Sequence, residues 1–163
     1  MKQKPSVYLE TSFISYLTGD PSRNLTTLQR QISSREWWES HRQNFTLMIS
    51  QAVIDECEQG DERVARRRRA FLAEAAVLDT TAAAAALAAA LVQPHGPLPA
   101  NARVDGVHIA VASVEACQYL LTWNLRHIAN PYIRRMIDNI IREYAYEPPV
   151  VATADQLIEG SPR

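Results

Sequence analysis

Four oxygen-bearing side chains fall where they could bind a divalent cation together. Glu10 closes the strand-like run SVYLE, Glu56 follows the run FTLMIS, Asp105 opens an apolar helix, and Asn124 follows the run CQYLLTW. Crowded carboxylates repel one another unless a cation neutralises them, and Mg²⁺ or Mn²⁺ does so with oxygen ligands. A bound ion of this kind polarises a phosphodiester and lowers the pKa of an attacking water. The four residues therefore predict a metal site that hydrolyses phosphodiester bonds.

Asp105 contributes most to this prediction, because the helix that it opens is apolar on nearly every side. In the segment VDGVHIAVASVEAC, valines recur at helical spacing, and Ile109 with two alanines covers the opposite side. A carboxylate in such a helix is costly unless it is paired, capped or bound to a cation. An N-cap role is the structural alternative for Asp105.

The other three candidates have ordinary alternatives of their own. Glu10 can be a simple strand-end carboxylate, and Asn124 can be a turn residue, a common role for asparagine. Glu56 stands between Asp55 and Glu58, so any of these three carboxylates can be merely solvated. Chemistry at this site therefore depends on the fold bringing the four residues together.

Histidines and cysteines do not indicate a competing zinc site. His108 and His127 each follow a candidate residue by three positions, and we expect them to form hydrogen bonds beside the site or in the core. Cys57 and Cys117 are the only cysteines, and they belong to no close pair or Cys/His cluster. Both are expected to be buried, reduced side chains.

Alternating strand and helix patterns predict the elements that position the candidates. Strands are expected at residues 6–10, 45–50, 76–80, 117–123 and 148–153. Helices are expected between them, one of them arginine-rich and capped by Asp61, one alanine-rich over 81–92, and one starting at Asn130 and Pro131. The span from 25 to about 43 is either one bent helix or two, with Ser33 and Glu36 forming a capping box that restarts it.

Five strands separated by helices indicate an α/β fold, an α/β/α sandwich with a five-stranded parallel sheet. Active sites of open parallel sheets form beyond the carboxyl ends of the strands, where the strand order reverses. All four candidate residues are expected at that end of the sheet. We expect residues 1–163 to form a single domain, since neither a linker nor an internal repeat interrupts the pattern.

Composition is that of an ordinary soluble globule, with 47% hydrophobic and 21% charged residues. No apolar run is long enough to span a bilayer, and the chain enters a strand directly, so we expect no membrane association and a cytoplasmic location. The net charge of −1 does not by itself indicate a nucleic-acid binder. Arginines cluster at 63–69 and 126–142, either as solvated helix faces or as a basic rim around an acidic site.

Four ordered stretches, VYLETSFISYL, ISQAVIDECEQG, VDGVHIAVA and YLLTWNLRHIANP, extend over nearly the whole chain. Their order resembles the four motif regions of PIN-domain ribonucleases, and most closely those of the VapC-type toxins of bacterial toxin–antitoxin pairs. In that family the first motif ends its strand with an acidic residue followed by Thr-Ser, as at Glu10, Thr11 and Ser12. The second has a Glu with a Gly three or four residues later, which selects Glu56 and Gly60.

The third and fourth motifs match in the same way. The third is an Asp before a buried helix with a histidine one turn on, as at Asp105 and His108. The fourth is a strand followed by a small hydroxyl residue and an acidic one, a pattern matched by Thr122 and Asn124. Two positions depart from the family pattern, since the usual residue is Asp at both Glu10 and Asn124. Asn124 can still ligate through its amide oxygen, but it adds no charge.

The resemblance implies a PIN-like fold and a metal-dependent endoribonuclease that leaves 5′-phosphate and 3′-hydroxyl ends. Glu10, Glu56 and Asp105 would hold Mg²⁺ or Mn²⁺, with Asn124 completing the ligand shell, and nearby hydroxyls would bind metal-bound waters. These hydroxyls belong to Thr11, Ser12 and Thr122.

The family also implies an RNA substrate, a cognate antitoxin and a homodimer. Aromatic residues are interface candidates or core residues, namely Trp37, Trp38 and Phe45. Two alternatives are a catalytically impaired module that binds RNA or antitoxin, and a DNA-directed nuclease on the same fold.

Overall fold

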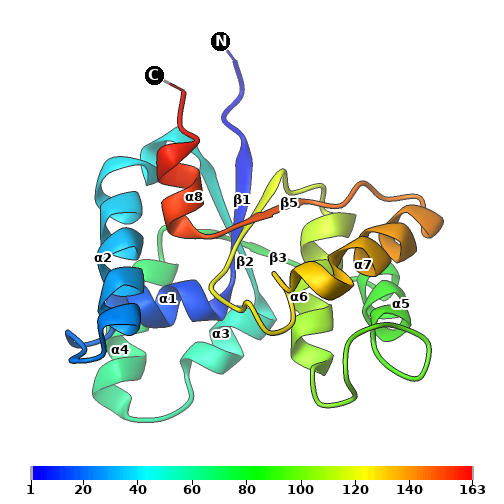
Figure 1. Ribbon diagram of the computed structural model, residues 1–163, viewed down its shortest axis with the longest axis horizontal. Coiled ribbons are helices and arrows are strands. Elements are labelled where there is room, and N and C mark those ends of the chain that lie inside the picture. The colour runs from blue at the N-terminus through cyan, green and yellow to red at the C-terminus, as the bar shows by residue number, and fades with distance from the viewer. Residues whose placement is uncertain (1, 163) are drawn as a thin grey trace.

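The computed structural model describes residues 2–162, and its five strands form one parallel sheet in the order β3-β2-β1-β4-β5 (Figure 1). Each neighbouring pair of strands is parallel. The strands are β1 (Ser6–Leu9), β2 (Thr46–Ser50), β3 (Ala76–Leu78), β4 (Tyr119–Leu121) and β5 (Val150–Ala152). Every predicted strand is confirmed, each within its expected range, and the predicted parallel sheet is confirmed with them.

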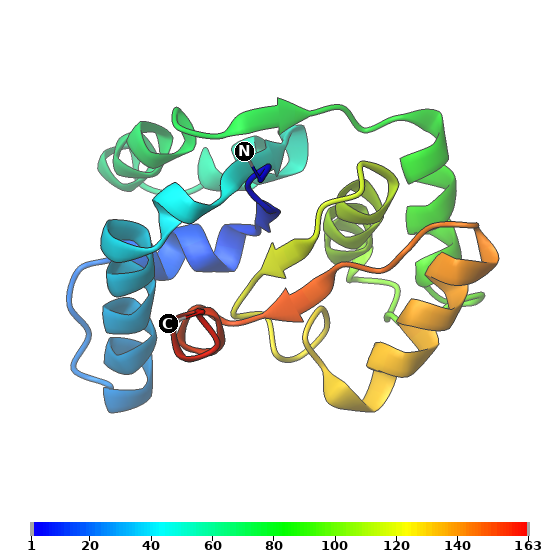
Figure 2. The ribbon, with the colours of Figure 1, turned by 90° about the horizontal axis from the view of Figure 1, so that it is seen from above.

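Helices cover both faces of this sheet (Figure 2). One group of helices comprises α1 (Thr11–Thr18), α2 (Leu25–Ser40), α4 (Glu62–Leu72) and α8 (Ala154–Glu159), and the other comprises α5 (Ala82–Leu91), α6 (Arg103–Val114) and α7 (Pro131–Glu143). The short α3 (Gln51–Cys57) contacts α1 and α4 of the first group and α6 of the second. Within residues 2–162, no helix has both the length and the apolar character that a membrane crossing needs.

The central strand β1 shows why the two layers form. Val7, Tyr8 and Leu9 are all fully buried, as expected of a parallel strand that is covered on both faces. Trp37 on α2 is also fully buried and packs edge-on against Phe13 of α1. Trp38 is buried too, so both tryptophans are core residues and their proposed role as interface contacts is wrong.

The chain from residue 25 to 44 does not divide as its sequence pattern suggests. A single helix runs from Leu25 to Ser40, followed by the short 3₁₀ helix η1 (Arg42–Asn44). Asn24 is the N-cap, with its Oδ1 accepting from Thr27 N at 3.0 Å. The predicted capping box at Ser33 and Glu36 is therefore wrong. Ser33 lies inside the helix with its side chain buried, where burial outweighs the local preference of serine for caps.

Two predicted helix starts are confirmed. Asp61 caps α4, and Asn130 caps α7 with Pro131 in its first turn. Thr81 caps α5, a contact not predicted from the sequence. At the start of α8 (Ala154–Glu159), Gln156 Oε1 accepts from Thr153 N at 3.0 Å as part of a capping box. The helix after β2 ends at Cys57, three residues before Gly60, whose φ of +88° serves the turn into α4.

The strand order reverses beside β1, which has β2 on one side and β4 on the other. Hydrogen bonds continue the ladder just past the strand ends, from Glu10 N to Leu121 O at 3.1 Å and from Thr122 N to Ala152 O at 3.0 Å. The carboxyl ends of β1 and β4 therefore lie together at the reversal point, which is where ligands bind in open parallel sheets.

Candidate metal centre

Glu10 lies at the reversal point, as the residue between β1 and α1. It is the N-cap of α1, and its Oε2 accepts from Ser12 N at 3.0 Å, from Ser12 Oγ, and from Thr122 Oγ1 at 2.7 Å. The side chain is only 4% exposed. Burial raises the pKa of the Glu10 carboxyl, and the nearby His108 and these three hydrogen bonds offset only part of that rise.

Glu56 approaches the same point from α3, which starts directly after β2. Its Oε1 accepts from Thr11 Oγ1 at 2.7 Å and contacts His108 Nε2 at 2.5 Å. Partial burial by itself raises the pKa of the Glu56 carboxyl, but His108 and Thr11 together bring it below the usual value. Glu56 is therefore held as a carboxylate.

Both carboxylates use only one oxygen for these bonds. No hydrogen bond from residues 2–162 reaches Glu10 Oε1 or Glu56 Oε2. Within the same residues, neither side chain forms an ion pair with a lysine or an arginine. Two adjacent carboxylates that keep a free oxygen each and have no basic partner fit a hard cation, because oxygen ligands are those that Mg²⁺ and Mn²⁺ prefer.

His108 completes the cluster. One ligand atom each of Glu10, Glu56 and His108 lie within 4.8 Å of one another. The ring of His108 is fully buried, and its Nδ1 lies 2.7 Å from the Tyr8 hydroxyl. Because both ring nitrogens already have hydrogen-bond partners, His108 matches the expected hydrogen-bonding role better than a direct ligand role.

Asp105 and Asn124 form a second group at the same edge of the sheet. Asp105 Oδ2 lies 2.8 Å from His127 Nδ1, and Asn124 Oδ1 accepts from His127 N at 3.0 Å. Asp105 is not the N-cap of α6, since Ala102 holds that position, so the capping alternative is wrong. Asn124 thus caps the turn after β4, which is the role of a turn residue that its sequence position also allowed. Asp105 lies outside the three-residue cluster.

Hydroxyl groups connect the two groups of residues. Thr122 Oγ1 donates to Glu10 and accepts from Asn124 N at 2.9 Å. Trp123 N donates to Ser12 Oγ at 2.8 Å. The hydroxyls of Thr11, Ser12 and Thr122, expected to bind water, thus hydrogen-bond the carboxylates directly.

Tyr8 was not foreseen as part of this site. Its hydroxyl contacts Ser50 Oγ at 2.6 Å as well as His108, and burial raises the pKa of the phenol, so it stays protonated. The available signal was a tyrosine inside a run of otherwise apolar, buried strand residues, because a buried hydroxyl needs a partner.

Cys57 and Cys117 are buried free thiols, as expected. Burial raises the pKa of each to about 11, so both remain protonated at neutral pH.

The clustered arginines mostly pair with other groups. Arg67 pairs with Asp20 at 2.9 Å, and Arg69 pairs with Glu58 at 2.5 Å and with Glu62 at 2.6 Å. Arg68 donates to backbone carbonyls of the turn after α3 instead of to a carboxylate. These contacts favour a solvated, ion-paired helix face over a basic rim for this run.

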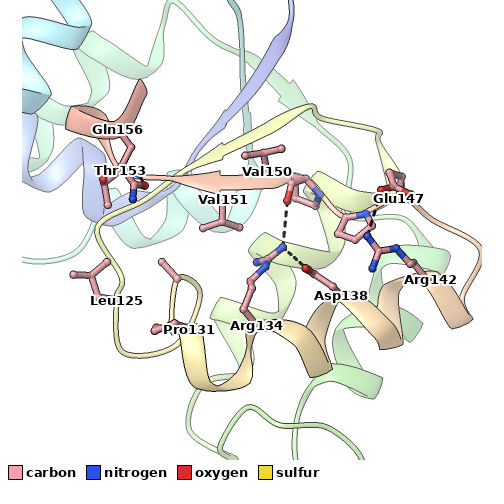
Figure 3. Close-up of a pocket in the computed structure, with 13 residues that line it drawn as sticks. Leu125, Pro131, Arg134, Asp138, Arg142, Glu147, Val150, Val151, Thr153 and Gln156 are labelled. Carbon is pink, nitrogen blue, oxygen red and sulfur yellow. Dashed lines mark hydrogen bonds and ion pairs between the residues drawn. The ribbon is translucent and has the colours of Figure 1, made fainter. Parts of the chain in front are cut away.

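Arg134, from the second arginine cluster, lines a cavity of about 450 Å³ between β5 and α7 (Figure 3). Arg134 pairs there with Asp138 at 2.7 Å and donates to Pro149 O at 3.2 Å. Burial lowers the pKa of Arg134, and Asp138 offsets part of this. None of the four candidate residues lines the cavity, so it is separate from the carboxylates.

The comparisons with known proteins agree with one another on the fold of this chain. The family model of the PIN domain matches residues 7–131. VapBC2 from Rickettsia felis, solved with a fragment of its promoter DNA, is similar at 17% identity and a TM-score of 0.57, covering 90% of this chain and 97% of that chain.

Two further solved structures are similar. FitAB bound to an IR36 DNA fragment has 16% identity and a TM-score of 0.56, covering 91% of this chain and 94% of that one. DNA-bound VapBC from Salmonella typhimurium has 17% identity and a TM-score of 0.55, covering 92% of this chain and 98% of that one. At these identities the likeness establishes the fold. No curated protein is significantly similar in sequence.

Proposed function

The chain belongs to the PIN domain family, and from this premise we propose that it is a divalent-metal-dependent endoribonuclease, the toxin of a toxin–antitoxin pair. The observation that carries the proposal is the adjacent pair Glu10 and Glu56, each with one oxygen that receives no hydrogen bond from residues 2–162. Such a pair has its charge compensated when a cation binds.

The proposed ligands are Glu10, Glu56 and Asp105, with Asn124 completing the ligand shell or orienting a water. A bound Mg²⁺ or Mn²⁺ supplies a Lewis acid for the phosphodiester and lowers the pKa of a water. The protein's own contribution is orientation. Ser12 and Thr122 hold Glu10, and Thr11 with His108 holds Glu56. The products of such hydrolysis are 5′-phosphate and 3′-hydroxyl ends.

The proposed partners follow from the similar structures. Those structures are VapBC and FitAB assemblies, and we extend the pairing to this chain as a proposed cognate antitoxin. A peptide of the antitoxin would cover the carboxylate edge and exclude RNA from it. A homodimer is proposed separately, as the family resemblance implies.

The test is cleavage of mixed cellular RNA by the purified protein, freed of antitoxin, in Mn²⁺, in Mg²⁺ and in chelator. We expect discrete cleavage with either metal and none with chelator. Glu56→Gln and Asp105→Ala should each lower the rate at least about 100-fold while the fold is kept. Glu58→Gln is the matched control, because Glu58 lies two residues from Glu56 but pairs with Arg69. Cleavage that survives Asp105→Ala or chelation would overturn the proposal.

A second candidate function is a catalytically impaired module that binds RNA or antitoxin. It is favoured by Asn124, whose neutral amide oxygen is already occupied by the backbone N–H of His127. The variant Asn124→Asp separates the two functions. Activity that appears only in this variant would indicate lapsed catalysis, whereas activity already present in the native protein excludes it. Running single-stranded DNA beside RNA tests the DNA-directed alternative.

A further inference from the structure

A continuous chain of hydrogen bonds joins the buried core to Glu56. Ser50 Oγ lies 2.6 Å from the Tyr8 hydroxyl, and that hydroxyl lies 2.7 Å from His108 Nδ1. His108 Nε2 then lies 2.5 Å from Glu56 Oε1. The side chains of Ser50, Tyr8 and His108 are fully buried, so water does not interrupt the chain.

With a neutral His108 ring, one assignment of protons satisfies every bond in this chain. A carboxylate only accepts, so His108 must donate to Glu56 from Nε2. A ring with its proton on Nε2 has an accepting Nδ1, to which the Tyr8 hydroxyl donates. The oxygen of Tyr8 then accepts from Ser50. Tyr8 therefore satisfies Nδ1 in the tautomer that donates to Glu56, and it holds the ring in that orientation.

The same chain determines which oxygen of Glu56 is free. Both protein donors to Glu56, Thr11 and His108, bond to Oε1, and Oε2 is left without a hydrogen bond from residues 2–162. A histidine that could rotate or change tautomer would no longer hold the carboxylate in this orientation. Residues that hold the hydrogen-bond partner of a metal-binding carboxylate affect the affinity for the metal without touching it.

We propose that Tyr8 is a positioning residue which, through His108, orients the Glu56 carboxylate toward a cation shared with Glu10. The inference rests on the proposed function, since it assigns Tyr8 a role in the same metal site. It predicts that removal of one hydroxyl in the core changes metal affinity and leaves RNA affinity unchanged.

The first test compares Tyr8→Phe with Tyr119→Phe. Tyr119 lies in the neighbouring strand β4, and its hydroxyl has no hydrogen bond to residues 2–162, so it controls for loss of a tyrosine hydroxyl. By calorimetry, Tyr8→Phe should bind Mn²⁺ about 10- to 100-fold more weakly, and Tyr119→Phe should match the native protein. In cleavage assays, Tyr8→Phe should need correspondingly more Mn²⁺, with the KM for RNA unchanged and the rate restored at saturating metal.

The second test needs neither metal nor activity. Nitrogen-15 correlation spectra of the metal-free native protein locate the proton on the His108 ring, with expected placement on Nε2 and none on Nδ1. In Tyr8→Phe, a population with the proton on Nδ1 should appear. A native ring with a proton on Nδ1 would overturn the inference, and this readout holds even where Tyr8→Phe does not fold.

The outcomes separate the two proposals. A native protein that neither binds Mn²⁺ nor cleaves RNA overturns the proposed function, and the role of Tyr8 in it as well. A native protein that does both, with Tyr8→Phe equal to Tyr119→Phe in Mn²⁺ affinity, overturns the positioning role alone. Loss of thermal stability in Tyr8→Phe with unchanged Mn²⁺ affinity would leave Tyr8 a purely structural residue and contradict the inference.

Discussion

Glu10 combines burial with a role that requires charge, and these two properties oppose each other. Its carboxyl is 4% exposed and its pKa is raised by burial, although three hydrogen bonds favour the ionised form. An ionised carboxylate at this depth destabilises the metal-free protein until a cation binds. The residue thus links the stability of the fold to the occupancy of the proposed site.

Replacing that charge by a neutral group of the same shape should stabilise the metal-free protein. We expect Glu10→Gln to raise the free energy of unfolding by about 1 kcal/mol at neutral pH in chelator, because the buried charge is removed. Added Mn²⁺ should raise the melting temperature of the native protein and leave that of the variant unchanged. Glu36→Gln, on the exposed face of α2, is the control and should change neither quantity.

The pH dependence of stability follows from the same residue. Because burial raises the pKa of Glu10, the folded protein holds this proton more tightly than the unfolded chain does. The stability contributed by protonated Glu10 is present below the usual pKa of 4.5 and is lost as the pH rises through the raised value. Chemical denaturation across that range in chelator should show this loss in the native protein. Persistence of the same loss in Glu10→Gln would assign it to another group.

Single residues also show what the sequence could and could not predict. Glu10 and the hydroxyls that bond the carboxylates could be singled out because they directly follow β1 and β4, and Glu56 because it lies on the helix after β2 with Gly60 four residues on. Tyr8 was not, because a tyrosine in a strand usually packs in the core. Its role depends on Ser50 and His108, which lie 42 and 100 positions away in the chain.

At the level of elements, α2 is where local pattern and tertiary packing disagree. The capping pattern at Ser33 predicted a break, but the helix continues because its inner face packs on the core and on the segment after β4. Ser34 Oγ accepts from Trp123 Nε1 at 2.8 Å, a buried bond that joins α2 to the residue before Asn124. Information of this kind lies in the packing and is absent from a local window.

That bond can be tested with two neighbouring serines. Ser34→Ala should destabilise the protein by about 1–3 kcal/mol, because it leaves the buried indole N–H without a partner. Ser33→Ala is the matched control, since Ser33 is also buried but its hydroxyl has no hydrogen bond to residues 2–162. Urea denaturation of both variants measures the difference. Equal effects would mean that the Trp123 bond contributes nothing beyond the burial of a serine.

The loop between α5 and α6 depends on a glycine. A Cβ at Gly96 would lie 2.2 Å from the backbone carbon and oxygen of Leu91, which cannot yield as a flexible side chain can. Gly96→Ala should therefore cost about 3 kcal/mol and loosen the start of α6, where Asp105 lies. Ala100→Ser, at an exposed position of the same loop, is the control and should cost less than about 0.5 kcal/mol. A near-neutral Gly96→Ala in urea denaturation would show that the loop has another conformation of similar energy.

At the level of the whole molecule, charge is nearly balanced, and most of the basic groups in the two arginine clusters are already paired. The net charge is −1, and arginines in ion pairs include Arg63, Arg67, Arg69, Arg134 and Arg142. Arg103 and Arg126 are exposed, form no ion pair within residues 2–162, and lie beside Asp105 and Asn124 in sequence. An RNA strand at the carboxylate edge would therefore meet few free positive charges.

Few free charges imply a shallow salt dependence of RNA binding. With two or three phosphates contacted, the slope of log K against log salt should be about −2 for single-stranded RNA, and Arg126→Gln should reduce its magnitude by about 0.7. Arg142→Gln is the control, because Arg142 pairs with Glu147 at 3.5 Å and lies near the far end of α7. Fluorescence anisotropy in chelator measures binding without cleavage. A native slope steeper than about −4 would mean that ion-paired arginines release their carboxylates to bind phosphate, and the paired clusters would then be part of the RNA site.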